Sequence, residues 1–181
     1  KMWTYVEGTM QMERANLIHK NTQYQDYIDR IKRAEEGRIF CLHNMSHFMD
    51  VARIAQIINL EEGLHIQKEL IYATALLHDI GRFQQYEFGI PHEIASAELA
   101  PEFLEESGFS IEEQTEILRA IREHRNPKVA GEKSLAGVIY RADKASRACF
   151  GCEAEGLCDW SKEKKNLEIA FAGESQARNK Y

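Results

Sequence analysis

An imidazole and a carboxylate stand side by side at the end of an apolar segment of this chain. Residues 75–83 read ALLHDIGRF, so a run of small and aliphatic residues leads directly into His78 and Asp79. A carboxylate buried at the end of such a run costs several kcal/mol unless it is paired or bound to a metal. Other residues must therefore compensate this charge.

Further histidines and aspartates recur on or beside apolar helical stripes. Taken singly, such residues are usually hydrogen-bonded core histidines or helix-capping aspartates. Together they would crowd one core with groups that need partners, and a divalent metal supplies a partner for all of them. Mixed imidazole and carboxylate ligands suit Fe, Mn, Zn, Co or Ni better than Ca or Mg. The candidate ligands are His47, His78, Asp79, His92, His124 and Asp143.

Apolar residues recur at steps of three and four along most of the chain, which is typical of amphipathic helices. No stretch alternates for long enough to predict a strand, so we expect an all-α bundle with five core helices around a metal site. We expect Pro101 to kink or split its helix, a loop over residues 81–91, and a capping box at Ser110 and Glu113. The predicted helices cover residues 12–37, about 44–59, about 67–79, from about 92, from 110 to about 127, and about 134–149.

The order and spacing of these residues resemble the H…HD…D signature of the HD-domain metal-dependent phosphohydrolases. The motif HDIGRF resembles its common bacterial form, and the resemblance covers roughly residues 40–150. An Ala-Asp-Lys at residues 142–144 is also similar to a diadenosine-tetraphosphate hydrolase family, whereas the GYP segment of the cyclic-di-nucleotide branch is missing. The resemblance implies a first ion bound by His47, His78, Asp79 and Asp143, and a second ion bridged by Asp79 and held by His92 and His124.

Such a site implies hydrolysis of a nucleotide or another small phosphate ester or anhydride. One or two ions, with Fe or Mn favoured and Zn, Co or Ni as alternatives, would polarise the phosphoryl group and activate a hydroxide, with Asp79 as the central carboxylate. Cationic groups should surround the non-bridging oxygens. Arg82 and Lys144 are the candidates, although solvated or salt-bridged charges are the alternative. His43 precedes His47 by four residues and is expected to be partly exposed; a role beside the ligands or as a proton donor is the alternative.

Two other function classes use the same ligand types. A few proteins of this family use a di-iron site with O2, so a di-iron oxygenase is the main alternative to the phosphohydrolase. A non-catalytic, metal-stabilised binding module is a weaker alternative because all six ligand types are present. The residues do not separate these classes.

Composition limits the partners. The chain has 181 residues, a formal charge of −6 and a pI of about 5.7, which argues against a broad electrostatic grip on extended nucleic acid. No apolar run approaches the length of a membrane span. We therefore expect a cytoplasmic protein with a small phosphorylated substrate, and the oligomeric state stays open.

The C-terminal region carries two further patterns. Cys149, Cys152 and Cys158 have zinc-like spacing, but a fourth ligand such as Cys41 would have to come from elsewhere, so we favour free thiols. Residues 166–181 resemble the first helix of rubrerythrins, with Glu174 at the position of a di-iron ligand. The rest of that bundle is not in the sequence, so Glu174 is not expected to bind metal. We expect an HD domain over residues 12–160 and a truncated rubrerythrin-like helix over 161–181.

Overall fold

The computed structural model describes residues 12–147, and these residues form helices without any strand. The all-α prediction is confirmed. No helix among these residues has both the length and the apolar character needed to cross a membrane. The elements are α1 (Glu13–Lys20), α2 (Thr22–Ala34), α3 (Met45–Glu61), α4 (Lys68–Leu77), α5 (Arg82–Phe88), α6 (His92–Glu106), α7 (Ile111–Glu123), the 3-10 helix η2 (Pro127–Val129) and α8 (Leu135–Ala145).

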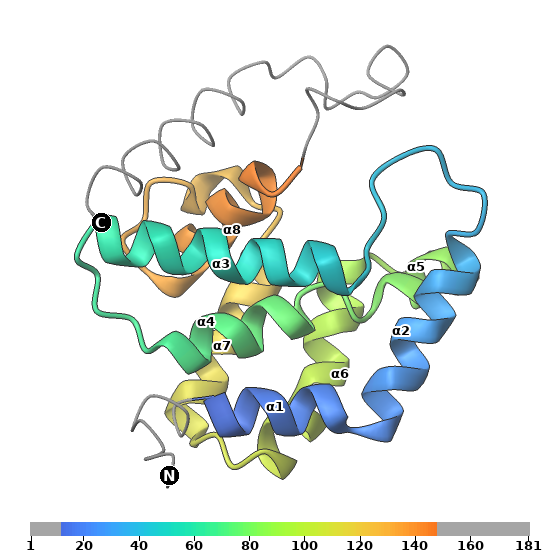
Figure 1. Ribbon diagram of the computed structural model, residues 1–181, viewed down its shortest axis with the longest axis horizontal. Coiled ribbons are helices and arrows are strands. Elements are labelled where there is room, and N and C mark those ends of the chain that lie inside the picture. The colour runs from blue at the N-terminus through green and yellow to red at the C-terminus, as the bar shows by residue number, and fades with distance from the viewer. Residues whose placement is uncertain (1–11, 148–181) are drawn as a thin grey trace, which may run out of the picture.

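Helix α4 lies at the centre of the bundle. It contacts α1, α3, α7 and α8, and seven of its ten residues are buried. Helices α3 and α8 pack side by side, while α6 packs on α7 and α5 lies against α2 and α6 (Figure 1). The apolar segment that ends in His78 and Asp79 therefore runs through the core, as its composition predicts.

The first predicted helix is two helices in the structure. Asn21 separates α1 from α2 with an extended backbone, and its side chain accepts hydrogen bonds from the backbone N–H groups of Gln23 and Tyr24. An asparagine in this position satisfies donors that would otherwise be unpaired at the start of a helix. The break allows α1 to pack on α4 while α2 turns towards α5.

One other local prediction is wrong. The segment predicted as a loop contains helix α5, which ends at Gly89 in the left-handed conformation that glycine adopts readily. Helix α6 continues through Pro101, which excludes the split, while the kink stays a prediction. The capping box is confirmed, because the Ser110 hydroxyl accepts from the Glu113 N–H and the Glu113 carboxylate accepts from the Ser110 N–H at 2.8 Å.

Gly81 lets the turn after α4 approach α6 closely. A Cβ atom at this position would lie 2.4 Å from the backbone nitrogen of Ser96 and 2.6 Å from the Cβ of Ala95. The Gly81 N–H also donates to the Ser96 hydroxyl at 2.9 Å. This contact fixes the turn that carries Asp79 against the helix that begins with His92.

We expect Gly81→Ala to destabilise the fold by about 1–3 kcal/mol or more, because the added methyl group would overlap the backbone of α6. Denaturant unfolding measures the change. Gly131→Ala is the matched control, since a Cβ there meets nothing within 4 Å. Equal stability of the two variants would contradict the close approach.

Candidate metal centre

The structure brings all six candidate ligands together, although they come from five helices or helix ends. His47 lies in the first turn of α3, His78 and Asp79 directly follow α4, and Asp143 lies in α8. His92 is the first residue of α6 and His124 directly follows α7. Metal binding by these residues stays a prediction, and their geometry shows whether they fit a metal.

The first group of potential ligand atoms surrounds one oxygen of Asp79. Its Oδ2 lies 3.6 Å from His47 Nε2 and 3.3 Å from His78 Nε2. Oδ1 of Asp143 lies 3.5 Å from His47 Nε2 and 4.0 Å from His78 Nε2. Two imidazoles and two carboxylates therefore converge, as the family resemblance implies for a first ion.

The second group surrounds the other oxygen of the same carboxylate. Oδ1 of Asp79 lies 3.2 Å from His92 Nε2 and 3.7 Å from His124 Nε2. The two Nε2 atoms lie 3.2 Å from each other. Asp79 thus directs one oxygen to each group, which is the arrangement required of a bridging carboxylate.

Two of the imidazoles are oriented by the ends of their own helices. The Nδ1 atom of His78 lies 2.7 Å from the carbonyl oxygen of Ala75, and the Nδ1 of His124 lies 2.6 Å from that of Ile121. A carbonyl only accepts hydrogen bonds, so both Nδ1 atoms carry the proton. The lone pair of each ring is then on Nε2, which faces Asp79.

The other two imidazoles are oriented by side chains. His92 Nδ1 lies 2.6 Å from the amide oxygen of Gln85, again an acceptor. His47 Nδ1 lies 3.3 Å from the Ser146 hydroxyl, which donates its own proton to the Asp143 carbonyl and is left to accept. Hydrogen bonds of this kind at Nδ1 typically fix the tautomer of histidines that bind metal through Nε2.

Three of the inward-facing atoms lack hydrogen-bond partners. His47 Nε2, His78 Nε2 and Asp79 Oδ1 are buried without any such partner in the described part of the chain. With the protons on Nδ1, lone pairs of imidazole nitrogens and carboxylate oxygens face one another at contact distance. That arrangement is unfavourable unless a cation lies between them. The six residues therefore fit a divalent transition metal.

The protonation of His92, His124 and Asp143 also agrees with this role. Burial lowers the pKa of His92 to about 2 and that of His124 to about 4, so both rings are neutral near pH 7, the form that binds metal. Burial raises the pKa of Asp143, but the nearby Arg147, Lys144, His78 and His124 together outweigh burial and hold that pKa below its ordinary value. The carboxylate is consequently ionised.

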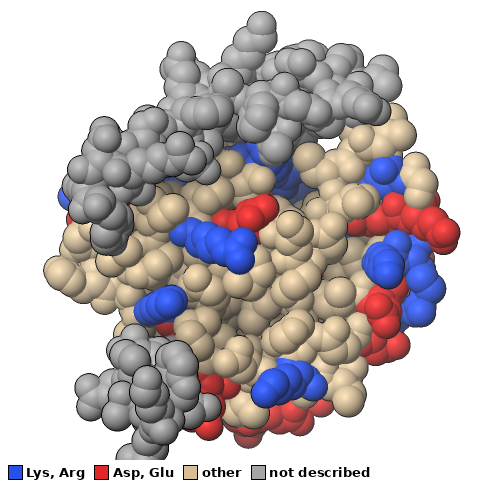
Figure 2. Space-filling view, in the orientation of Figure 1, with Lys and Arg blue, Asp and Glu red and all other residues tan. Residues whose placement is uncertain are grey.

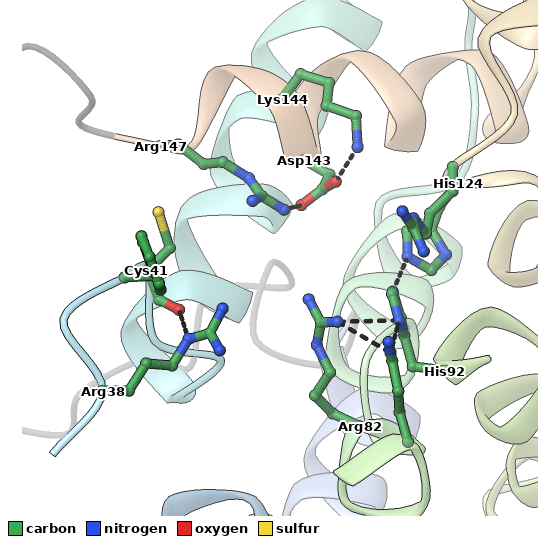
Figure 3. Close-up of a pocket in the computed structure, with 11 residues that line it drawn as sticks. Arg38, Cys41, Arg82, His92, His124, Asp143, Lys144 and Arg147 are labelled. Atoms are coloured by element: carbon green, nitrogen blue, oxygen red, sulfur yellow. Dashed lines mark hydrogen bonds and ion pairs between the residues drawn. The ribbon is translucent and has the colours of Figure 1, made fainter. Parts of the chain in front are cut away.

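A cavity of about 180 Å³ opens beside the two groups. It is rich in cationic side chains, while Asp143 is its one acidic lining residue among those described, and Figure 3 shows these side chains around it. In a chain with a net charge of −6, such a lining concentrates positive potential at one point. The cavity is lined by Arg38, Phe40, Cys41, Arg82, Gln85, His92, His124, Arg125, Asp143, Lys144 and Arg147.

The two predicted cations lie in the cavity but differ in their partners. Lys144 Nζ contacts Asp143 Oδ2 at 2.8 Å, which matches the salt-bridged alternative for this residue. Arg82 directs its terminal nitrogens to His43 and to the amide oxygen of Gln85, and its Nη1 also lies 3.0 Å from His92 Nδ1. Arg82 therefore contacts the second group both directly and through Gln85, whose amide oxygen accepts from His92.

His43 is buried, and the expectation that it is partly exposed was wrong. Only 2% of it is accessible, and its Nε2 lies 3.8 Å from Asp79 Oδ2. Its burial depends on Glu35, a partner across a loop, which spacing alone does not reveal. The positions of Gln85 and Arg147 were also missed, although Arg147 follows Asp143 at the helical spacing of four. Cys149, Cys152, Cys158 and Glu174 lie outside the described residues.

Comparison with known proteins identifies similar chains. The HD-domain family model matches residues 44–148, within the region of the resemblance. An uncharacterized protein of Clostridium beijerinckii is 48% identical over 160 residues, which are 88% of this chain and 100% of that one. Ribonuclease Y of Lawsonia intracellularis is 32% identical over 136 residues, covering 75% of this chain but 24% of that protein.

A solved structure shows the same fold. The crystal structure of a predicted HD superfamily hydrolase from an uncultured Thermotogales bacterium superposes with a TM-score of 0.56 at 23% sequence identity. The similarity covers 90% of this chain and 97% of the other. The helical arrangement that carries the six residues is therefore shared with a known structure.

We expect divalent metal to stabilise the wild-type chain and not Asp79→Asn, because the amide keeps the shape but loses the bridging charge. Metal at a hundred times its dissociation constant should add about 2.7 kcal/mol per site. Thermal unfolding with and without Mn²⁺ measures this. Asp50→Asn changes a partly exposed aspartate of α3 and is the control. Full metal stabilisation of Asp79→Asn would contradict a bridging role.

We expect His124→Ala to lower the metal content from close to two ions per chain towards one, because only the second group loses a ligand. Elemental analysis of protein prepared without chelator gives the stoichiometry. His19→Ala removes an exposed imidazole and should leave the count unchanged. A single ion in metal-saturated wild type, unaffected by His124→Ala, would contradict two positions.

Proposed function

The chain belongs to the HD-domain family, and from this we propose that it is a metal-dependent phosphohydrolase acting on a nucleotide or another small phosphate ester or anhydride. The observation that carries the proposal is the single carboxylate of Asp79, which faces two imidazole pairs beside a cationic cavity. This combination suits a reaction in which an anionic group must be held and attacked.

The bound ions, with Fe or Mn as the favoured metals, would supply the Lewis-acid and water-activating chemistry of phosphoryl transfer. The chain's own residues do the remaining work. Asp79 holds the two ligand groups at a fixed separation, and Asp143 completes the first. Arg82 and Lys144 line the cavity and are suited to contact the non-bridging oxygens, whose charge increases during the transfer.

The cavity supports a small substrate. Its volume of about 180 Å³ is suited to a phosphate group and part of the moiety attached to it. Figure 2 shows acidic and basic side chains interspersed on the displayed face, without a continuous basic stripe. An extended polyanion gains little from such a surface.

The ribonuclease Y relatives set a second test for the substrate. The chain spans about a quarter of their length. Ribonuclease activity is therefore an alternative that the assay has to include. A substrate panel should therefore include a short oligoribonucleotide beside nucleoside mono-, di- and triphosphates and dinucleotides. Turnover of the small compounds and not of the oligomer supports the proposal.

We expect Arg82→Ala to lower kcat/KM for the best substrate by roughly 10- to 100-fold, because a hydrogen bond to a charged group contributes about 1.5–3 kcal/mol. The metal content should stay at the wild-type level. Arg53→Ala, which removes an exposed arginine of α3, is the control and should retain full activity.

Anaerobic assays with Mn²⁺ or ferrous iron test the proposal as a whole. Release of phosphate from at least one small compound, lost together with metal in Asp79→Asn, supports it. If no phosphorylated compound is turned over and the iron-loaded protein consumes O2 with an organic substrate, a di-iron oxygenase replaces the phosphohydrolase.

A further inference from the structure

A buried carboxylate outside the ligand set lies close to the metal centre. Glu35 directly follows α2, and only 5% of it is accessible. Its Oε2 accepts the backbone N–H of His43 at 2.7 Å, and its Oε1 accepts the Tyr86 hydroxyl at 2.7 Å and the imidazole Nδ1 of His43. A buried charge with this many donors is held in one position.

These contacts fix the proton of His43. Burial raises the pKa of Glu35, but the interactions with His43 and the hydrogen bond from Tyr86 together outweigh burial and lower that pKa below its ordinary value, so the carboxylate is ionised and only accepts. Nδ1 of His43 must then carry the hydrogen. The guanidinium of Arg82 can only donate, so its contact with Nε2 of His43 also places the lone pair of the ring on Nε2.

The lone pair on Nε2 of His43 accepts a hydrogen bond from Arg82. Nη2 of Arg82 donates to His43 Nε2, and Nη1 donates to the Gln85 amide oxygen at 3.1 Å. Nε of Arg82 is buried and has no hydrogen-bond partner in the described part of the chain. The guanidinium is thus held at both ends beside the ligand groups, in a cavity that it lines.

We propose that Glu35 and His43 are positioning residues that hold the Arg82 guanidinium ready for a phosphate oxygen of the substrate. Glu35 holds the proton of His43 on Nδ1. The lone pair on Nε2 of His43 then accepts the hydrogen bond that orients Arg82. Neither residue needs to contact the substrate. The inference rests on the proposed function, since it gives Arg82 a phosphate as its ligand.

Glu35→Gln tests the chain of contacts because it keeps the shape and changes the hydrogen-bond pattern. If the new amide oxygen accepts the backbone N–H of His43, its NH2 group faces Nδ1. The ring must then carry its proton on Nε2, which meets an N–H of Arg82, donor against donor. Glu36→Gln makes the same substitution at the next, exposed residue and is the matched control.

Phosphate binding is the first readout. Calorimetry of inorganic phosphate on the metal-loaded protein should show affinity about tenfold weaker in Glu35→Gln, the scale of one lost charge-assisted hydrogen bond. The metal content should not change, and Glu36→Gln should bind like wild type. His43→Leu removes the acceptor directly and gives the same measurement if Glu35→Gln does not fold.

A double-mutant cycle separates positioning from other roles. In the Arg82→Ala background, Glu35→Gln and His43→Leu should change phosphate affinity and kcat/KM by no more than about twofold, because their effects pass through the missing guanidinium. An effect that persists in this background, as a proton-donating His43 would give, overturns the proposal. So does unchanged phosphate affinity in both single variants.

The tautomer of His43 is an independent readout. Ring ¹⁵N resonances of the zinc-loaded protein, assigned by their loss in His43→Gln, should show the proton on Nδ1 in wild type and on Nε2 in Glu35→Gln. The opposite tautomer in wild type overturns the proposal while leaving the proposed function intact. If metal-loaded wild type binds no phosphate at all, the proposed function itself fails.

Discussion

The carboxylate of Asp79 is the interaction on which the rest of the structure depends. It is almost fully buried, and imidazole nitrogens from α3, α6 and the ends of α4 and α7 face its two oxygens. No combination of neutral rings can stabilise that charge when their protons point away from it. The bundle therefore has to bring four helices to one carboxylate and leave space for cations between them.

Much of this arrangement could be predicted from the sequence because helical periodicity and ligand type are local properties. The stripes of α3, α4, α7 and α8 were recognised, and so was the convergence of His47, Asp79 and Asp143 on one core. The predictions that were wrong concern features that are determined by contacts between elements. Asn21 ends one helix and starts another within a single amphipathic pattern, and α5 forms where the turn at Gly81 packs on α6.

The surroundings of the ligands could not be predicted in the same way. His43 has the spacing of a residue on the stripe of His47, but its burial and its proton are set by Glu35, which lies eight residues earlier across a loop. Likewise Gln85 becomes a partner of His92 because α5 and α6 lie against each other. Such pairs follow from the fold and carry no sequence pattern of their own.

The two ways of orienting the imidazoles differ in their tolerance to mutation. His78 and His124 are held by main-chain carbonyls of their own helix ends, which every amino acid provides, so replacement of Ala75 or Ile121 leaves that hydrogen bond available. His92 is instead contacted at Nδ1 by two side chains, those of Gln85 and Arg82. Substitution at either position can therefore change the basicity of His92, and with it the second group, while the rings that follow α4 and α7 stay constant.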